Sequence, residues 1–277
     1  MNVVRRIAEL RAARESLASP LGLVPTMGAL HDGHLSLIRR AREECASVVV
    51  SLFVNPTQFG AHEDLGAYPR DLSRDLELAE QAGADLVWAP EVDEMYPPGF
   101  QTWVQLESLT KPLEGLHRPG HFRGVTTVVA KLFNAVQPQR AYFGQKDAQQ
   151  AAVVRRMVVD LNFPLEIVVC PIVREADGVA MSSRNAYLNS DERRGAAVLF
   201  RALSAAAEAF AAGEREADGL RGVMARVLAE EPLARPQYIS IADPESLQEL
   251  EGQVERALLS LAVHFGNTRL IDNLIVG

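Results

Sequence analysis

The sequence places several candidate ligand-binding residues in one short loop near its N-terminus. The segment PTMGALHDGH (25–34) follows an apolar run and precedes a pattern of helical period. A helix N-terminus offers unpaired backbone N–H groups and the positive end of the helix dipole, which favours an anion. His31 and His34 can donate hydrogen bonds to one phosphate chain, and Gly33 lets a ligand approach the backbone. We therefore expect a phosphate-binding loop, against the alternative of a solvated turn capped by Asp32.

Three further segments contain residue types that suit anionic or polar ligands. In GQKDAQQ (144–150), Lys146 would oppose the dipole of the helix it begins unless an anion or Asp147 compensates its charge. In VREADGVAMSSRN (173–185), two hydroxyls stand beside a guanidinium, a combination that binds phosphate oxygens. The amides of NPTQFG (55–60) are a weaker signal. A solvated lysine and a polar surface loop remain the alternatives. The sequence contains no Walker A motif and no G-x-G-x-x-G after a strand.

The elements that must position these segments follow a regular alternation. Between residues 21 and 170, short apolar runs alternate with helical patterns, which is typical of βαβ units on a parallel sheet. The expected strands are 21–24, 48–54, 85–88, 102–106, 140–143 and 166–169, and the expected helices are 33–46, 71–82 and 145–160. Ligands bind beyond the carboxyl ends of such strands, where the candidate loops lie.

The pattern changes beyond about residue 190. Two helices are expected over 191–212 and 214–230, followed by β-type runs at 237–241, 256–263 and 269–271. The predicted fold class is therefore α/β, a Rossmann-like doubly wound parallel sheet with a smaller C-terminal α+β domain. The predicted domains are residues 1–172 and 173–277.

Composition limits the classes of function. The 277 residues include 28 Lys and Arg against 36 Asp and Glu, giving a net charge of −8, which argues against broad nucleic-acid binding. Apolar runs such as 48–54 are shorter than the roughly 20 residues that span a bilayer, and the N-terminus does not resemble a signal peptide. Cys45 and Cys170 lack C-x-x-C spacing and predict buried thiols in a reducing compartment. We expect a cytoplasmic protein without nucleic-acid or membrane partners.

Six blocks in order resemble the pantoate–β-alanine ligases, a family of the nucleotidylyl transferase superfamily that also includes class I aminoacyl-tRNA synthetases. The blocks are PTMGALHDGHLSLI (25–38), VSLFVNPTQFG (50–60), YPRD (68–71), RPGHFRGV (118–125), YFGQKDAQQ (142–150) and VREADGVAMSSRN (173–185). HDGH corresponds to the superfamily's H-x-G-H signature. MSSR stands in the place of the synthetases' K-M-S-K-S loop, with Ala180 where their first lysine would be.

The resemblance implies ATP-dependent condensation of (R)-pantoate with β-alanine to pantothenate, AMP and pyrophosphate through a pantoyl adenylate, in a homodimer. It implies an ATP site formed by Met27, Gly28, Ala29, Leu30, His31, Asp32, Gly33, His34, Gly144, Gln145, Lys146, Asp147, Val173, Met181, Ser182, Ser183 and Arg184. The catalytic groups among them would be His31, His34, Lys146 and Arg184, and pantoate would contact Gln58 and Gln150. Mg²⁺ is expected with the phosphates; no protein ligand is assigned, and Asp75 is the nearest carboxylate candidate.

Three other functions are compatible with parts of the pattern. H-x-G-H alone does not choose the acceptor of the adenylyl group, so another adenylyltransferase is one alternative, although the blocks around Gln58 and Gln150 argue against it. An RNA-binding relative of the synthetases is a second alternative, which the acidic charge disfavours. A nucleotide sensor without turnover is the third.

Overall fold

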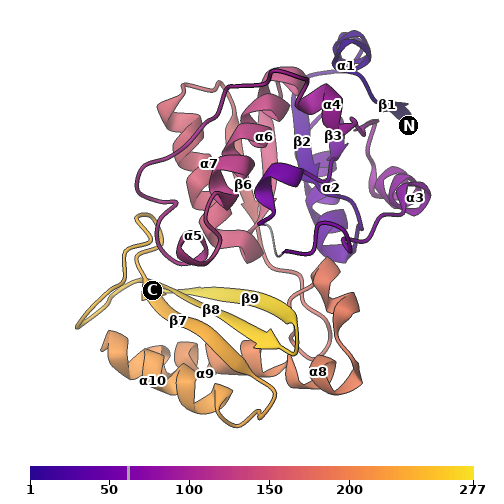
Figure 1. Cartoon of the computed structure of the whole chain (residues 1–277). Helices are drawn as coiled ribbons and strands as arrows, with labels where there is room; N and C mark the ends of the chain where they lie inside the picture. Colours follow the sequence, from indigo (N-terminus) through magenta and orange to yellow (C-terminus); the bar gives the residue numbers. More distant parts are fainter. Residues whose placement is uncertain (61–62) are drawn as a thin grey trace. The chain divides into compact units, whose positions relative to one another are not determined.

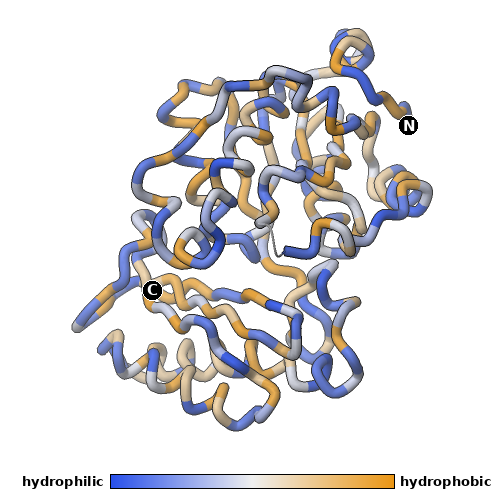
Figure 2. The backbone as a smooth tube through the Cα atoms, in the orientation of Figure 1, coloured by the Kyte–Doolittle hydropathy of each residue, from blue (hydrophilic) through white to orange (hydrophobic). Residues whose placement is uncertain are grey.

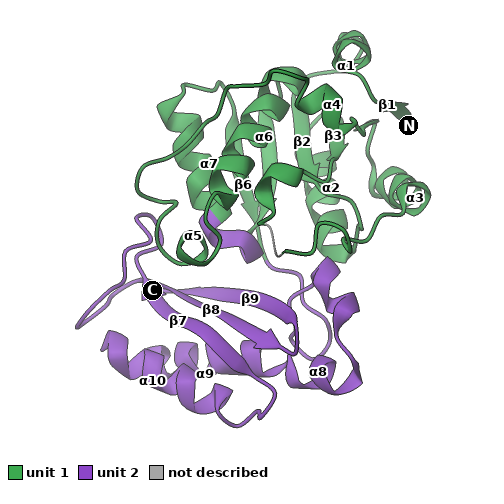
Figure 3. Ribbon diagram, in the orientation of Figure 1, with its two compact units in different colours: residues 1–144, 150–171 green, residues 145–149, 172–277 purple. Residues whose placement is uncertain are grey.

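The computed structural model describes residues 1–60 and 63–277, which fold into two compact units (Figure 3). Unit 1 comprises residues 1–144 and 150–171, and unit 2 comprises residues 145–149 and 172–277. The short segment 145–149 thus groups with the C-terminal part of the chain, although it directly follows Gly144, the last residue of a strand of unit 1. In the part of the chain that the structure describes, no helix is long and apolar enough to cross a membrane.

Unit 1 contains a six-stranded parallel sheet in the order β1-β4-β3-β2-β5-β6 (Figure 1). The strands are β1 (Asn2–Val4), β2 (Leu21–Thr26), β3 (Ser47–Leu52), β4 (Leu86–Trp88), β5 (Arg140–Gly144) and β6 (Glu166–Cys170). The chain order reverses at β2, because β3 pairs with one of its edges and β5 with the other. This is the topological switch point at which doubly wound sheets bind ligands. The predicted Rossmann-like sheet is confirmed.

Helices cover both faces of this sheet. They are α1 (Ile7–Arg14), α2 (Asp32–Glu44), α3 (Leu72–Ala82), α4 (Val92–Met95), α5 (Glu114–His117), α6 (His121–Val136) and α7 (Ala148–Asp160), with a 3₁₀ turn η1 (Pro56–Gln58) after β3. Successive side chains of a strand leave on opposite faces. Accordingly Val49 packs in the core with α1, α6 and α7, whereas Val48 and Val50 pack in the core with α2 and α3.

Helix α6 lies within residues 107–139, a range in which the sequence patterns predict no helix or strand. It is buried on most sides and rich in β-branched residues, which have a low helix propensity. Its threonine hydroxyls donate back to carbonyls of the preceding turn, Thr126 to Phe122 at 2.8 Å and Thr127 to Arg123 at 2.6 Å. Tertiary packing, rather than local preference, makes this segment helical.

The strand expected over 102–106 is wrong: these residues form no β-ladder. The backbone of Val104 instead bonds to α6. Its N–H donates to Thr127 Oγ1 at 3.0 Å, and its carbonyl, 2.6 Å from Thr126 Oγ1, shares the proton of that hydroxyl with the Phe122 carbonyl. Threonine hydroxyls thus satisfy backbone groups that a neighbouring strand would otherwise bind.

Unit 2 contains an antiparallel sheet in the order β7-β8-β9 with two long helices. Its elements are the 3₁₀ turns η2 (Gln145–Asp147) and η3 (Ser183–Tyr187), α8 (Ser190–Gly195), α9 (Val198–Ala211), α10 (Ala217–Leu228), β7 (Arg235–Ala242), β8 (Ala257–Phe265) and β9 (Thr268–Val276). Strand β8 is central and mostly hydrophobic (Figure 2). Leu261 on β8 belongs to the same core as Leu203 and Leu220 on α9 and α10.

The single helix expected over 191–212 is also wrong, because the segment forms α8 and α9. At the junction, the N–H groups of Ala197 and Leu199 bond three residues back instead of four. A Cβ on Gly195 would lie 3.0 Å from the Glu231 carboxyl carbon, so the chain passes Glu231 closely at this point. The alanine-rich composition predicts a continuous helix, but Gly195, a residue that often ends helices, is the last residue of α8.

The packing of α6 against η1 yields a stability prediction. A Cβ on Gly124 would lie 2.4 Å from the carbonyl oxygen of Thr57, whereas a Cβ on Gly222, in α10, would meet only the Arg226 Nη1 at 3.6 Å. We expect Gly124→Ala to lower the free energy of unfolding by about 1–3 kcal/mol through overpacking. The matched Gly222→Ala should raise it by about 0.5–1 kcal/mol, because alanine is the better helix former. Urea denaturation of both variants measures the difference, and equal effects would contradict the close approach.

Candidate active site

The loop between β2 and α2 has a backbone that few sequences could adopt. Gly28 has φ +82° and Ala29 has φ +51°, so two successive residues are left-handed. The Thr26 hydroxyl donates to the Ser51 carbonyl at 2.9 Å and accepts the N–H of Gly28 at 3.2 Å. A Cβ on Gly28 would lie 2.8 Å from Asp75 Oδ2, so this position requires glycine for space as well as for conformation.

The buried carboxylate of Asp75 lies beneath this loop. Asp75 is on α3 and only 4% exposed, and it accepts the N–H of Ala29 at 2.9 Å and the N–H of Leu30 at 2.7 Å. Burial raises the pKa of Asp75, and the hydrogen bonds from Leu30 and Ala29 oppose that shift. Successive N–H groups in such a turn form an anion-binding concavity. Here an internal carboxylate binds them, so phosphate binding by this loop would fall to the two histidine rings.

Helix α2 presents His31 and His34 at its first turn. His31, rather than Asp32, is the N-cap residue, and the two imidazole ring centroids are 4.1 Å apart. The N–H of His31 donates to Nδ1 of His34 at 3.4 Å. Because Nδ1 accepts, neutral His34 carries its proton on Nε2, where it can donate to a ligand oxygen.

Gln58 lies in η1, just beyond the carboxyl end of β3, and its side chain is held at both ends. Its Oε1 accepts from Asn55 Nδ2 at 3.1 Å, and its Nε2 donates to the thioether of Met27 at 2.9 Å. Asn55 is itself fixed, because its Oδ1 accepts from Tyr96 Oη and Thr57 Oγ1 at 2.9 Å each. A thioether is a weak acceptor, so a ligand oxygen can replace it at small cost.

His121 supports Gln58 from α6. Its Nδ1 lies 2.8 Å from the Gln58 carbonyl oxygen and donates to it, which leaves Nε2 to accept from Arg118 at 3.1 Å. Arg118 also forms a two-point ion pair with Glu63, at 2.6 and 2.7 Å. Burial, with Arg118 as a further cause, lowers the pKa of His121 to about 4. The ring is therefore neutral near pH 7.

The candidate residues of unit 1 all lie at or beyond the carboxyl ends of the parallel strands. The loop 27–34 follows β2, Gln58 follows β3, and Gln150 lies in the first turns of α7, beyond β5. Strands β3 and β5 flank β2, and all three are parallel. Gln58, after β3, and Gln150, after β5, therefore follow the two strands that neighbour the strand of the histidine loop. Gly144 is the last residue of β5.

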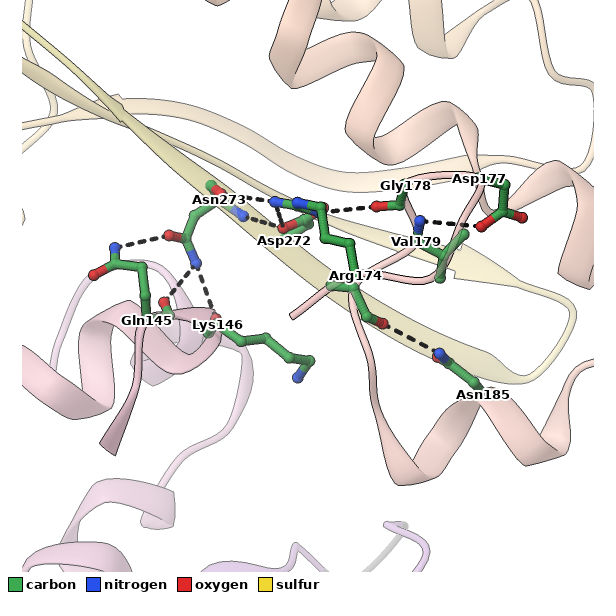
Figure 4. Close-up of polar contacts among 10 residues, drawn as sticks. Gln145, Lys146, Arg174, Asp177, Gly178, Val179, Asn185, Asp272 and Asn273 are labelled. Atoms are coloured by element: carbon green, nitrogen blue, oxygen red, sulfur yellow. Dashed lines mark hydrogen bonds and ion pairs between the residues drawn. The ribbon is translucent and has the colours of Figure 1, made fainter. Parts of the chain in front are cut away.

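The remaining candidates belong to unit 2. Gln145, Lys146 and Asp147 form η2, in which Lys146 Nζ lies 3.8 Å from Asp147 Oδ1. Asn273 of β9 binds this turn through both ends of its amide (Figure 4). Lys146 is thus placed in a 3₁₀ turn immediately before α7, close to the helix start that the sequence predicts.

The Ser-Ser-Arg segment follows a short hairpin. Arg174 pairs with Ala180 in an antiparallel bridge, and the N–H of Met181 donates to the carbonyl of Val173 at 3.0 Å. The Ser182 hydroxyl then accepts the N–H of Arg184 at 3.3 Å and begins η3, which contains Ser183 and Arg184. The predicted residues thus form two groups, one in each unit.

Related proteins match this chain over its full length. A family described as pantoate–β-alanine ligase matches residues 2–275. The chain is 63% identical to the pantothenate synthetase of Roseiflexus sp. (strain RS-1) over 276 residues, covering 100% of this chain and 99% of that protein. It is 58% identical to the pantothenate synthetase of Herpetosiphon aurantiacus, covering 100% of both. The chain belongs to the pantoate–β-alanine ligase family.

Solved structures of pantoate–β-alanine ligases agree with the fold. The pantothenate synthetase of Thermus thermophilus matches with a TM-score of 0.95 and 52% identity, covering 99% of both chains. A ligase from Francisella tularensis, described as complexed with β-γ ATP and β-alanine, matches with a TM-score of 0.82 and 34% identity, covering 99% of this chain and 97% of that one. The predictions of the family, of ligase activity and of ATP as a substrate are confirmed.

The sequence patterns do not single out several residues that support the candidate site. His121 and Arg118 lie within a block that the resemblance uses, but no chemical signal in the sequence connects them to Gln58. Asn273 and Asp272 had a visible signal, since they are the polar pair in the apolar run LIDNLIV (270–276). The sequence makes Asp75 the nearest carboxylate candidate for a metal ligand, whereas in the structure both of its oxygens accept N–H groups of the loop.

The contacts of Asp75 lead to a prediction about the loop and magnesium. Asp75→Asn retains one acceptor oxygen but places an NH₂ group against the second N–H, so the loop should shift. We expect kcat to fall about tenfold or more, because small misplacements of positioning groups are costly. The Mg²⁺ concentration for half-maximal activity should stay within twofold of wild type. A large rise in that concentration would mean that Asp75 binds the metal.

The pKa of His121 leads to a prediction about stability and pH. A histidine whose pKa is lower in the folded than in the unfolded state takes up a proton on unfolding, so its contribution is lost as pH falls. With a folded pKa of about 4 and an unfolded value of about 6.5, the His121 contribution should fall by about 2 kcal/mol between pH 7 and pH 5. Urea denaturation at both pH values should show a smaller loss in His121→Gln. An equal loss in the two proteins would refute this assignment.

Proposed function

We propose that the protein joins (R)-pantoate to β-alanine, with cleavage of ATP to AMP and pyrophosphate, through a pantoyl-adenylate intermediate. The observation that carries this proposal is the full-length family match together with the histidine loop at the switch point of the sheet. The Francisella tularensis relative, described as complexed with β-γ ATP and β-alanine, supports two of the three substrates.

The chemistry has two balanced steps. A pantoate carboxylate oxygen attacks the α-phosphorus of ATP, the bond to the β,γ-phosphates breaks, and pyrophosphate leaves with the electron pair. The amine of β-alanine then attacks the acyl carbon of the adenylate and loses a proton, and AMP leaves as the amide forms. Negative charge grows on the departing phosphates in the first step, so donors placed there stabilise the transition state more than the ground state.

The residue roles in this proposal follow the two groups described above. The catalytic donors are His31, His34, Lys146 and Arg184. The ATP site comprises Met27, Gly28, Ala29, Leu30, His31, Asp32, Gly33, His34, Gly144, Gln145, Lys146, Asp147, Val173, Met181, Ser182, Ser183 and Arg184. Gln58 and Gln150 bind pantoate, because an amide can donate to a carboxylate and accept from a hydroxyl. The N–H groups of Ala29 and Leu30 donate to Asp75, which supports a role for these two backbones in the shape of the loop.

Magnesium enters this proposal with ATP. Among residues 1–60 and 63–277, no group of three or more His, Cys, Asp or Glu side chains is arranged to hold a metal ion. The donor set therefore fits a cation that is carried by the phosphate oxygens and neutralises their charge. Asp75 does not serve as a dedicated ligand in this scheme.

The remaining parts of the proposal concern the whole molecule. Residues 1–172 form the domain that binds ATP and pantoate, and residues 173–277 form a smaller lid-like domain. The protein acts as a homodimer in the cytoplasm, without nucleic-acid or membrane partners. The acidic net charge of −8 supports the absence of a nucleic-acid partner.

Product analysis tests the proposed reaction. Purified protein is incubated with ATP, Mg²⁺, (R)-pantoate and β-alanine, and the products are identified by mass spectrometry. AMP, pyrophosphate and pantothenate should form in equal amounts. Formation of ADP, or ATP consumption that does not depend on pantoate, would overturn the proposal and favour another adenylyltransferase or a nucleotide sensor.

The proposed donors lead to a mutational prediction. His34→Ala and Lys146→Ala should each lower kcat by about 10²-fold or more, the size expected when one transition-state donor is lost. The melting temperature should change little, because these side chains are not part of either core. His117→Ala and Lys111→Ala are the matched controls, since both side chains are exposed and lie outside the proposed site. Full activity in His34→Ala would remove that residue from the mechanism.

A further inference from the structure

Two adjacent polar residues are buried in the apolar run 270–276 of strand β9. Asp272 is 2% exposed and Asn273 is 4% exposed, and the strand around them reads LIDNLIV (270–276). A buried amide and a buried carboxylate are costly unless their hydrogen bonds are satisfied. Their partners therefore show what the pair does.

Asn273 binds the turn that carries Lys146. Its Nδ2 donates to the carbonyl oxygens of Gln145 at 3.0 Å and of Lys146 at 2.9 Å, and its Oδ1 accepts from Gln145 Nε2 at 2.9 Å (Figure 4). One side chain thus makes three hydrogen bonds to two consecutive residues. These bonds fix the backbone of Lys146, from which its ammonium group extends.

Asp272 binds the hairpin that precedes the Ser-Ser-Arg segment. It accepts two hydrogen bonds from the guanidinium of Arg174, at 2.6 and 3.0 Å, and a third from the backbone N–H of Asn273 at 2.8 Å. Arg174 also donates to the Gly178 carbonyl at 3.0 Å and lies 4.0 Å from the ring centroid of Phe200. The hairpin is therefore anchored on two sides before the chain reaches Ser182.

The geometry of a strand explains how one segment can do both. Consecutive side chains of a strand leave on opposite faces. In Figure 4, Asn273 reaches toward Gln145 and Lys146, whereas Asp272 meets Arg174. The backbone N–H of Asn273 bonds to Asp272, which couples the two anchors directly.

We propose that β9 is a positioning element for catalysis: Asn273 sets the position of Lys146, and Asp272 sets the start of the Ser-Ser-Arg segment through Arg174. This inference rests on the proposed roles of Lys146 and Arg184 in ATP binding. Asn273 and Asp272 are positioning residues, because each acts through another group. The C-terminal unit then contributes the alignment of two phosphate-binding segments in addition to its own core.

A purely structural role is the competing explanation, and the partners argue against it. A buried polar network contributes little net stability compared with well-packed apolar residues of similar volume. The strand neighbours of the pair, Ile271 and Leu274, show that apolar side chains are compatible with this sheet. A role in stability alone also does not explain why the partners of the pair are the Lys146 turn and the hairpin before the Ser-Ser-Arg segment.

The test is a double-mutant cycle on the first half-reaction. Wild type, Asn273→Ala, Lys146→Ala and the double variant are mixed with ATP, Mg²⁺ and (R)-pantoate, and pyrophosphate release is measured in a single turnover. Asn273→Ala should slow this step about tenfold or more and leave the KM for pantoate within twofold. In the Lys146→Ala background, Asn273→Ala should cause no further slowing, because the group it positions is already gone. Gln237→Ala, which removes an amide bonded to Arg269 on the same sheet, should behave as wild type.

The outcomes separate the inference from the proposed function. If Lys146→Ala keeps the wild-type rate, the proposed role of Lys146 is wrong. If Lys146→Ala is slow and Asn273→Ala multiplies the loss in the double variant, Asn273 does not act through Lys146 and the inference is overturned. If Asn273→Ala is unstable, Asn273→Asp replaces it in the same cycle. Aspartate has the shape of asparagine, but it places a carboxylate against the carbonyl oxygens of Gln145 and Lys146.

The second anchor has its own cycle. Asp272→Asn keeps the volume but removes the charge that holds Arg174, and it should slow pyrophosphate release in wild type but not in an Arg184→Ala background. Independent, multiplicative losses would restrict Asp272 to the stability of the unit, and would overturn this half of the inference. Chemical denaturation of Asp272→Asn, measured in parallel, ensures that the rates refer to folded protein.

Discussion

The contact between the Asp75 carboxylate and the backbone of the β2–α2 loop determines the geometry of the N-terminal site. Gly28 and Ala29 adopt left-handed conformations that are seldom populated, and the carboxylate accepts the two N–H groups that this turn directs toward α3. The loop therefore reaches the first turn of α2 in one shape before any nucleotide binds. His31 and His34 are placed by that shape, while Asp75 supplies the acceptors that hold the turn.

Polar side chains also hold the other candidate segments in place, and these side chains differ from one segment to the next. Gln58 is held by the Asn55 amide, and its carbonyl accepts from His121 on α6, a helix that packs so closely on η1 that Gly124 has no room for a Cβ. In unit 2, Asn273 and Asp272 do for η2 and for the 174–180 hairpin what Asp75 does for the β2–α2 loop. At the β2–α2 loop, at Gln58 and at η2, a residue that touches no proposed ligand satisfies backbone groups of the segment that does. Asp272 acts differently, because it binds the side chain of Arg174 in the hairpin that precedes the Ser-Ser-Arg segment.

Many of the side chains that hold these segments are uncharged, which suits a site for a highly charged substrate. His121 is neutral near pH 7 because burial and Arg118 lower its pKa, and Asn55, Gln58 and Asn273 are amides. The charge of Asp75 is balanced by two N–H donors and that of Asp272 by a guanidinium.

Apolar periodicity and strand-to-loop transitions are local properties, so the sequence predicts the fold class, the parallel sheet and the location of the candidate loops. His31, His34, Lys146 and the Ser-Ser-Arg segment were visible for the same reason: their chemistry is concentrated within a few consecutive residues. Long-range packing makes α6 a helix despite its β-branched residues, and it bonds residues 102–106 to threonine hydroxyls instead of to a strand. It also decided that Asp75 holds the loop and that Asn273 meets Lys146 across 127 positions of sequence. Those contacts join residues far apart in the chain, and no local pattern encodes which distant partner a buried polar group will find.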